Sequence, residues 1–172
     1  MAVFKVHGPF DVPFKKRQGG GRRLAFKEFW GKDSKASYLA GKCGCYVFAI
    51  QTPRGLMPLY VGLARKNFRQ EAFNPTNRDK YNDGFADYAR GTPVMFFVVH
   101  PPQRGRTNEK QILEIEDVLI QWAVARNPNL QNVKGAQTPA WSIQGVIRGG
   151  KGKPSKAETE FRKLFALKKQ GT

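Results

Sequence analysis

The acidic residue best placed to do chemistry is Glu116, in the segment 107–126. The apolar spacing of this segment predicts an amphipathic helix, with Thr107 or Asn108 as its N-cap and Asn127-Pro128 as its stop. On a helical wheel Glu116 lies inside the apolar arc, not on the polar face. A buried carboxylate is costly unless it is paired, hydrogen-bonded or metal-bound. We therefore expect Glu116 either to bind a divalent cation at a cleft or to pair with a buried arginine.

Two tyrosines lie on neighbouring segments that are rich in β-forming residues. Residues 43–50 (CGCYVFAI) and 56–61 (LMPLYV) are separated by the turn-prone sequence QTPRG, which predicts a β-hairpin. Tyr46 lies on the first strand and Tyr60 on the second. Taken singly, each tyrosine is typical of a sheet residue whose hydroxyl is satisfied at the rim.

Five further segments have the spacing of short helices or strands. They are helices over 65–73 and 83–89, strands over 92–99 and 140–148, and a C-terminal helix after Pro154. The dipeptide Asn74-Pro75 is expected to stop the first of these helices. Ser155 and Glu158 are expected to form a capping box at the start of the last one.

The charge of the chain points to a polyanionic partner. Lys and Arg total 30 against 13 Asp and Glu, a net charge of +17. Residues 1–42 and 133–172 each carry +7, and residues 43–132 carry only +3. The run KKRQGGGRR over 15–23 predicts a flexible basic loop or a mobile arm. The basic residues expected to bind nucleic acid are Lys15, Lys16, Arg17, Arg22, Arg23, Arg65, Lys66, Arg78, Lys80, Arg148, Lys151 and Lys153.

Length and composition narrow the class of protein. The chain has 172 residues, 40% of them hydrophobic, which favours one folded domain over a disordered or fibrous protein. No apolar run approaches the roughly 20 residues that cross a bilayer, so no membrane-spanning segment is expected. The N-terminus lacks an apolar stretch of signal-peptide length, and we expect a cytoplasmic protein. The oligomeric state is left open.

Several motifs occur in the order found in one nuclease family. Gly44-Cys45-Tyr46 and Tyr60-Val61-Gly62, with tyrosines 14 positions apart, resemble the paired signatures of GIY-YIG nucleases. The segment LARKNFRQ that follows resembles the basic first helix of that family. Glu116 in EDVLI resembles its metal-binding glutamate, and NPNLQN over 127–132 resembles the segment that closes the domain.

The resemblance implies a division of the chain and a fold class. It covers about residues 43–132, which would form the GIY-YIG-like domain. Residues 1–42 would be a basic N-terminal extension that contains glycines, and residues 133–172 a basic C-terminal extension with a strand and a terminal helix. The implied class is α+β, with a small three-stranded antiparallel sheet flanked by helices.

The same resemblance implies an activity. It is that of a metal-dependent endonuclease that hydrolyses phosphodiester bonds in DNA with one Mg²⁺ or Mn²⁺ ion. Carried onto this sequence, Glu116 would bind the cation, and Tyr46 and Tyr60 would line the site of the water and the phosphate. Asn132 would orient or stabilise that site.

The arginine of the family pattern is displaced in this sequence. The pattern places it ten residues beyond the first residue of the second signature, where this chain has Gln70. Arg69 precedes Gln70, and one residue along a helix turns a side chain by about 100°. Arg69 takes the catalytic role if the preceding loop resets the register. The candidate substitutes are Arg65, Arg78 and Lys80.

Three other interpretations stay open. A misplaced arginine would favour a nucleic-acid-binding module of the same fold whose chemistry is weak or lost. The basic arms alone would suit a structural RNA-binding protein, although DNA is the preferred partner. A membrane-surface protein would need a longer basic amphipathic helix than the C-terminal segment offers.

Overall fold

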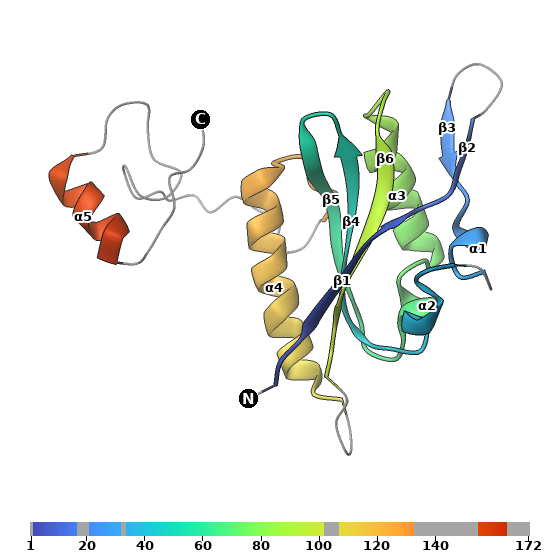
Figure 1. Cartoon of the computed structure of the whole chain (residues 1–172), viewed down its shortest axis with the longest axis horizontal. Coiled ribbons are helices and arrows are strands. Elements are labelled where there is room, and N and C mark those ends of the chain that lie inside the picture. Colours follow the sequence, from blue (N-terminus) through green and yellow to red (C-terminus); the bar gives the residue numbers. More distant parts are fainter. Residues whose placement is uncertain (1, 17–20, 32–33, 102–106, 133–154, 165–172) are drawn as a thin grey trace. The chain divides into compact units, whose positions relative to one another are not determined.

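The structure is a computed structural model (Figure 1). The residues that it describes are 2–16, 21–31, 34–101, 107–132 and 155–164. By its contacts the chain divides into two compact units, residues 1–137 and residues 138–172. In the described part of the second unit there is one helix, α5 (Lys156–Leu164).

A four-stranded antiparallel sheet forms the centre of the first unit. Its strands are β1 (Lys5–Asp11), β4 (Gly44–Thr52), β5 (Gly55–Ala64) and β6 (Thr92–Val99), in the order β1-β6-β4-β5. The α+β class is confirmed, as are the predicted hairpin and the strand over 92–99. The expected count of three strands is wrong, because β1 pairs with β6 along the edge away from β5.

The basic run over 15–23 begins and ends within two short strands, which the sequence did not predict. Phe14–Lys16 (β2) and Arg22–Leu24 (β3) pair as a separate two-stranded sheet. Phe14 lies opposite Leu24, and this apolar pair packs at the end of the ladder, next to the core. The expectation of a loop or arm is therefore wrong for the four basic residues that lie in these two strands.

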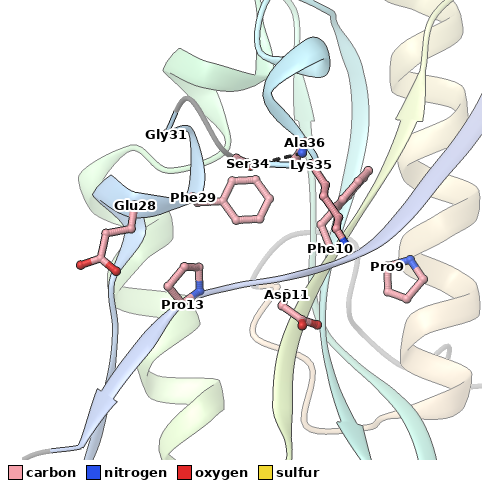
Figure 2. Close-up of a pocket in the computed structure, with 10 residues that line it drawn as sticks. All are labelled: Pro9, Phe10, Asp11, Pro13, Glu28, Phe29, Gly31, Ser34, Lys35 and Ala36. Carbon is pink, nitrogen blue, oxygen red and sulfur yellow. Dashed lines mark hydrogen bonds between the residues drawn. The ribbon is translucent and has the colours of Figure 1, made fainter.

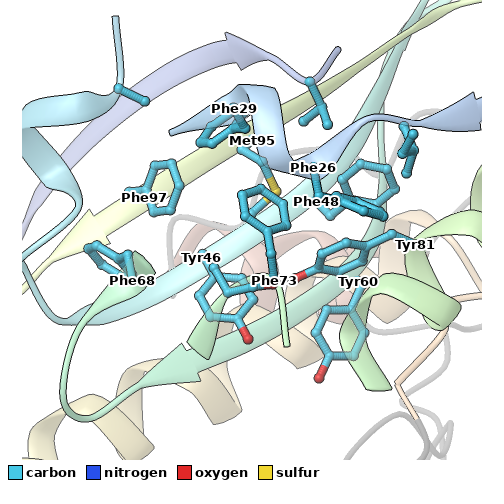
Figure 3. Close-up of a cluster of buried hydrophobic side chains, with 14 of the residues drawn as sticks. Phe26, Phe29, Tyr46, Phe48, Tyr60, Phe68, Phe73, Tyr81, Met95 and Phe97 are labelled. Carbon is cyan, nitrogen blue, oxygen red and sulfur yellow. Dashed lines mark hydrogen bonds between the residues drawn. The ribbon is translucent and has the colours of Figure 1, made fainter. Parts of the chain in front are cut away.

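The side chains of β4 alternate between two faces of the sheet. Tyr46 and Phe48 point into an aromatic cluster with residues of α1 (Phe26–Phe29), α2 (Phe68–Glu71) and α3 (Pro75–Ala86) (Figure 3). Cys45 and Val47 point to the other face, where they pack against residues of α4 (Glu109–Arg126). Helices therefore cover both faces, since the period of a strand is two residues.

The helix boundaries follow from asparagine caps. The Asn74 side chain accepts a hydrogen bond from the Asn77 backbone N–H at 2.9 Å, and Pro75 occupies the first turn of α3. Asn74-Pro75 therefore begins a helix, which was not predicted. The helix predicted over 65–73 is present but shorter, because α2 has only four residues and ends before Asn74. The predicted helix over 83–89 corresponds to the last turn of the longer α3.

The two other predicted caps are present. Asn108 accepts from the Gln111 N–H at 3.2 Å at the start of α4. The Ser155 N–H donates to Glu158 Oε2 at 2.6 Å, and the Glu158 N–H donates to Ser155 Oγ at 3.2 Å, which is the predicted capping box. The predicted strand over 140–148 lies outside the described residues. In the described ranges, no helix combines the length and the apolarity needed to cross a membrane.

Candidate active site

Tyr46 is held in a fixed position beneath α3. Its side chain is 2% exposed, and its hydroxyl accepts a hydrogen bond from Asn77 Nδ2 at 2.8 Å. Asn77 Nδ2 also donates to the Glu71 carbonyl at 2.9 Å, so α2 and α3 together orient the amide. Asn77 was not predicted from the sequence, because the segment that carries it was expected to be broken at Pro75.

Gly62 gives the Tyr46 ring its space. The two residues lie opposite each other in the β4–β5 ladder. A Cβ added at Gly62 would lie 2.5 Å from the Tyr46 hydroxyl oxygen and 2.6 Å from Cζ of the ring. The ring therefore lies directly over the backbone of β5, which explains why the second signature segment carries a glycine there.

Tyr60 lies beside Tyr46 and nearer to solvent. The two ring centroids are 6.5 Å apart, and Tyr60 is 9% exposed. Figure 3 shows both hydroxyls directed to the same side of the aromatic cluster. Lys80, from α3, places its Nζ 4.9 Å from the centroid of the Tyr60 ring, a cation-π contact. Tyr60 and Lys80 thus form the more accessible part of this tyrosine site.

Glu116 is in electrostatic reach of both tyrosines from α4. It is half-buried, while Ile112, Ile120 and Ala123 on the same helix are buried. Burial raises the pKa of Tyr60, and the negative charge of Glu116 raises it further. Burial likewise raises the pKa of Tyr46, with added contributions from the charges of Tyr60 and Glu116. The charge of the sequence-predicted carboxylate therefore acts on both sequence-predicted tyrosines.

The raised pKa values decide what the two hydroxyls can do. Both Tyr46 and Tyr60 stay protonated at neutral pH, since their ordinary pKa is already near 10. A protonated hydroxyl donates to a phosphate oxygen and accepts from a water molecule. Tyr60, the more exposed of the two, can therefore orient a nucleophilic water, and neither tyrosine acts as a phenolate base.

The donor set around Glu116 suits one kind of metal site. Among the described residues there is no group of three or more His, Cys, Asp or Glu side chains that could hold a metal ion. Zinc and calcium sites built wholly from protein ligands are not supplied there. A single carboxylate suits Mg²⁺, which keeps several waters and takes substrate phosphates as its other ligands. The residues fit an ion of that type.

Asn132 pairs with the free edge of the sheet. Its Oδ1 accepts from the Val61 N–H at 2.9 Å, and its Nδ2 donates to the Val61 carbonyl at 2.7 Å. Two neighbours extend this pairing: the Gln131 N–H donates to the Leu59 carbonyl, and Asn127 Nδ2 donates to the Pro58 carbonyl. Asn132 therefore positions β5, and with it the strand that carries Tyr60.

Replacing Asn132 with alanine is expected to lower the free energy of unfolding by about 1–3 kcal/mol, because Val61 would lose partners for two buried backbone groups. Urea unfolding followed by circular dichroism measures this change. Asn129→Ala is the matched control, since Asn129 is exposed on the same segment. Equal unfolding midpoints for the two variants would contradict the assigned role.

The predicted catalytic arginine is not part of the tyrosine site. Arg69 is exposed on α2, and within the described part of the chain its guanidinium forms no hydrogen bond or cation-π contact with either tyrosine. Arg65 pairs with Glu109, with 3.5 Å between its Nε and the Glu109 Oε2. Of the substitutes considered from the sequence, Lys80 is the one that contacts a site tyrosine.

The predicted nucleic-acid-binding residues are distributed over several elements. Lys15 and Lys16 lie on β2, Arg23 lies on β3, and Lys66 is exposed before α2. Arg22 is used within the fold: it donates to the Gly91 carbonyl at 2.7 Å and to the Tyr88 carbonyl, and it lies 4.1 Å from the Phe85 ring centroid. Four of the predicted residues lie outside the described part: Arg17, Arg148, Lys151 and Lys153.

A cavity of about 580 Å³ lies away from the tyrosines, between β1 and α1 (Figure 2). Asp11, Glu28 and Lys35 are its charged lining residues. The other lining residues are mainly apolar or small. None of the site residues predicted from the sequence lines this cavity.

The buried thiol of Cys45 is expected to make stability fall at alkaline pH. Burial, with the charge of Glu116, raises the pKa of Cys45 to about 12, whereas a thiol in the unfolded chain ionises near pH 8.5. The stability that this protonated thiol contributes is fully present below the pKa of the unfolded state and is lost as the pH rises through the pKa of the folded state. Above about pH 9 it falls by about 1.4 kcal/mol per pH unit.

The comparison that tests this is urea unfolding of wild type and Cys45→Ala in reducing buffer between about pH 8 and pH 10. The stability advantage of wild type should shrink with rising pH, because the variant lacks the titrating group. A difference that stays constant over this range would show that Cys45 ionises equally in both states.

Comparisons of the chain with protein-family models, with curated proteins and with solved structures find no match.

Proposed function

We propose that the chain is a metal-dependent endonuclease that hydrolyses phosphodiester bonds in DNA, with β5, β4 and β6 as a GIY-YIG-like core and β1 as an added strand. The observation that carries this proposal is the position of Glu116. From helix α4, its charge acts on Tyr46 and Tyr60, the tyrosines that the two signature segments place on β4 and β5. The basic excess of the chain agrees with a polyanionic substrate.

Each residue of the tyrosine site has a separate part in this chemistry. A divalent ion held by Glu116 would neutralise charge on the scissile phosphate and the leaving oxygen. Tyr60, the more exposed tyrosine, orients the attacking water through its protonated hydroxyl. Lys80 supplies positive charge next to Tyr60 as charge develops on phosphorus. Tyr46 is a positioning residue, fixed by Asn77 behind Tyr60.

A second candidate function is a nucleic-acid-binding module of the same fold with weak or lost chemistry. The observation that favours it is the exposed position of Arg69, which forms no hydrogen bond or cation-π contact with either tyrosine in the described part of the chain. Loss of an electrostatic stabiliser of this type typically costs about 10²–10³-fold in rate. The two functions share the binding surface and differ in turnover.

The test is cleavage of supercoiled plasmid by the purified full chain with Mg²⁺ or Mn²⁺, followed on agarose gels. Nicked or linear product that forms with either ion and disappears with EDTA is the expected result. Plasmid that stays supercoiled in the presence of folded protein that retards it in a gel would reject the nuclease and support the binding module.

A further inference from the structure

A second, smaller cavity lies on the other flank of α3 from Tyr60. Its volume is about 310 Å³, and it is bordered by β2, β3, α1 and α3. Four of its lining residues are basic: Lys15, Arg23, Lys27 and Arg78. Glu28 is the single acidic lining residue. The cavity therefore gathers positive charge from three elements that follow one another in the sequence, β2, β3 and α1, and from the distant helix α3.

Glu28 neutralises only part of this charge. Its carboxylate pairs with Lys15 Nζ at 2.9 Å. Arg23, Lys27 and Arg78 form no ion pair with any side chain in the described ranges. Three positive charges therefore remain to attract an anion at short range, where charges that share a concave surface reinforce one another.

Arg78 is the residue that points most directly to a ligand. Its Nε is buried and has no hydrogen-bond partner among the described residues. Its guanidinium carbon lies 5.7 Å from the centroid of the Phe26 ring, which holds the fork in place. A buried donor without a partner is unfavourable, and Arg78 also lines the cavity, where a guanidinium forms strong charge-assisted hydrogen bonds with phosphate oxygens.

We infer that this cavity, the Arg78 pocket, binds a backbone phosphate of the nucleic acid. The inference rests on the proposed function for the identity of the ligand. Arg78 and Lys80 are two positions apart on α3 and leave the helix about 200° apart. Lys80 meets Tyr60 on one flank, and Arg78 meets Phe26 on the other.

The spacing predicts which phosphate the pocket takes. A helix with its side chains is about 10 Å across, and one strand of B-DNA advances about 3.4 Å per phosphate. A duplex whose axis crosses α3 from Tyr60 to the Arg78 pocket therefore advances by about three nucleotides over that distance. The pocket would fix the register of the strand relative to the tyrosine site.

The test is binding of a fluorescein-labelled DNA duplex to the full chain by fluorescence anisotropy, in EDTA so that no cleavage occurs. We compare Lys27→Gln/Arg78→Gln with the control Lys5→Gln/Lys110→Gln, which removes the same charge from exposed positions elsewhere. The pocket variant should bind about tenfold more weakly. The slope of its log Kd against the logarithm of the salt concentration should be smaller than that of wild type by about 1–2. The control should stay within about twofold of wild type.

A single variant guards against misfolding of the double variant. Lys27 is exposed on α1, so Lys27→Glu should fold normally and still weaken binding by repelling the phosphate. Equal affinity and equal salt slope for the pocket and control variants would overturn the inference, even if the wild type cleaves plasmid. Weaker binding by the pocket variants would uphold it, even if the wild type proves unable to cleave.

Discussion

Glu116→Gln is expected to abolish metal-dependent cleavage while leaving DNA binding within about twofold of wild type. The amide keeps the size of the carboxylate but lacks the negative charge that a hard cation requires. Loss of the ion would remove several kcal/mol of transition-state stabilisation, and about 4 kcal/mol corresponds to roughly a thousandfold in rate. Plasmid nicking rates and anisotropy, measured on the same preparation, give both quantities.

The matched control is Glu114→Gln on the same helix. Glu114 is exposed and meets Lys110 at 4.0 Å, an i,i+4 pair of small energetic value. Its variant should cleave at close to the wild-type rate. If Glu116→Gln retained most of the activity, the carboxylate would not be the metal ligand and the proposed site would be wrong.

The parts of the fold that the sequence predicted correctly depend on local patterns. The β4–β5 hairpin follows from two β-rich segments around a turn, and α4 follows from its apolar period and its Asn108 cap. On the helical wheel that singles out Glu116, Trp122 also falls in the apolar arc, yet Trp122 is 69% exposed. Only the part of the arc that faces the sheet is buried, and the sequence does not show where the sheet lies.

The missed features depend on contacts between distant residues. Strand β1 contains Gly8 and Pro9, which interrupt a strand pattern, and its pairing with β6 is specified by residues about ninety positions later. Asn74-Pro75 both stops and starts helices, so sequence alone leaves its role ambiguous. Asn77 gains its role only because the fold brings it to the Tyr46 hydroxyl, 31 positions away in sequence.

The candidate site likewise contains residues that the sequence predicted and residues that it did not. Glu116, Tyr46 and Tyr60 were predicted as side chains of particular elements, and the charge of Glu116 on α4 raises the pKa of both tyrosines. The positively charged side chain that contacts a site tyrosine could not be chosen from the sequence. Only the structure shows how the three candidates differ in their surroundings. Arg69 is exposed on α2, Arg78 packs against the Phe26 ring, and Lys80 packs against the Tyr60 ring.

Gly62→Ala is the second variant with a large expected effect, and it should lower both stability and cleavage. The added methyl would lie 2.5 Å from the Tyr46 hydroxyl oxygen and 2.7 Å from Cε2. The Tyr46 ring has little freedom to move, because it is buried and its hydroxyl is bonded to Asn77. Overpacking of this kind costs about 1–3 kcal/mol in the free energy of unfolding.

Gly41→Ala is the control, because no atom lies within 4 Å of a Cβ added there. Urea unfolding should show Gly41→Ala at or slightly above wild-type stability and Gly62→Ala clearly below it. Cleavage is then compared at a temperature where both variants are folded, so that a loss confined to Gly62→Ala reports displacement of Tyr46. Wild-type stability and cleavage in Gly62→Ala would mean that the ring can leave β5 at no cost, and that its position is not required by the site.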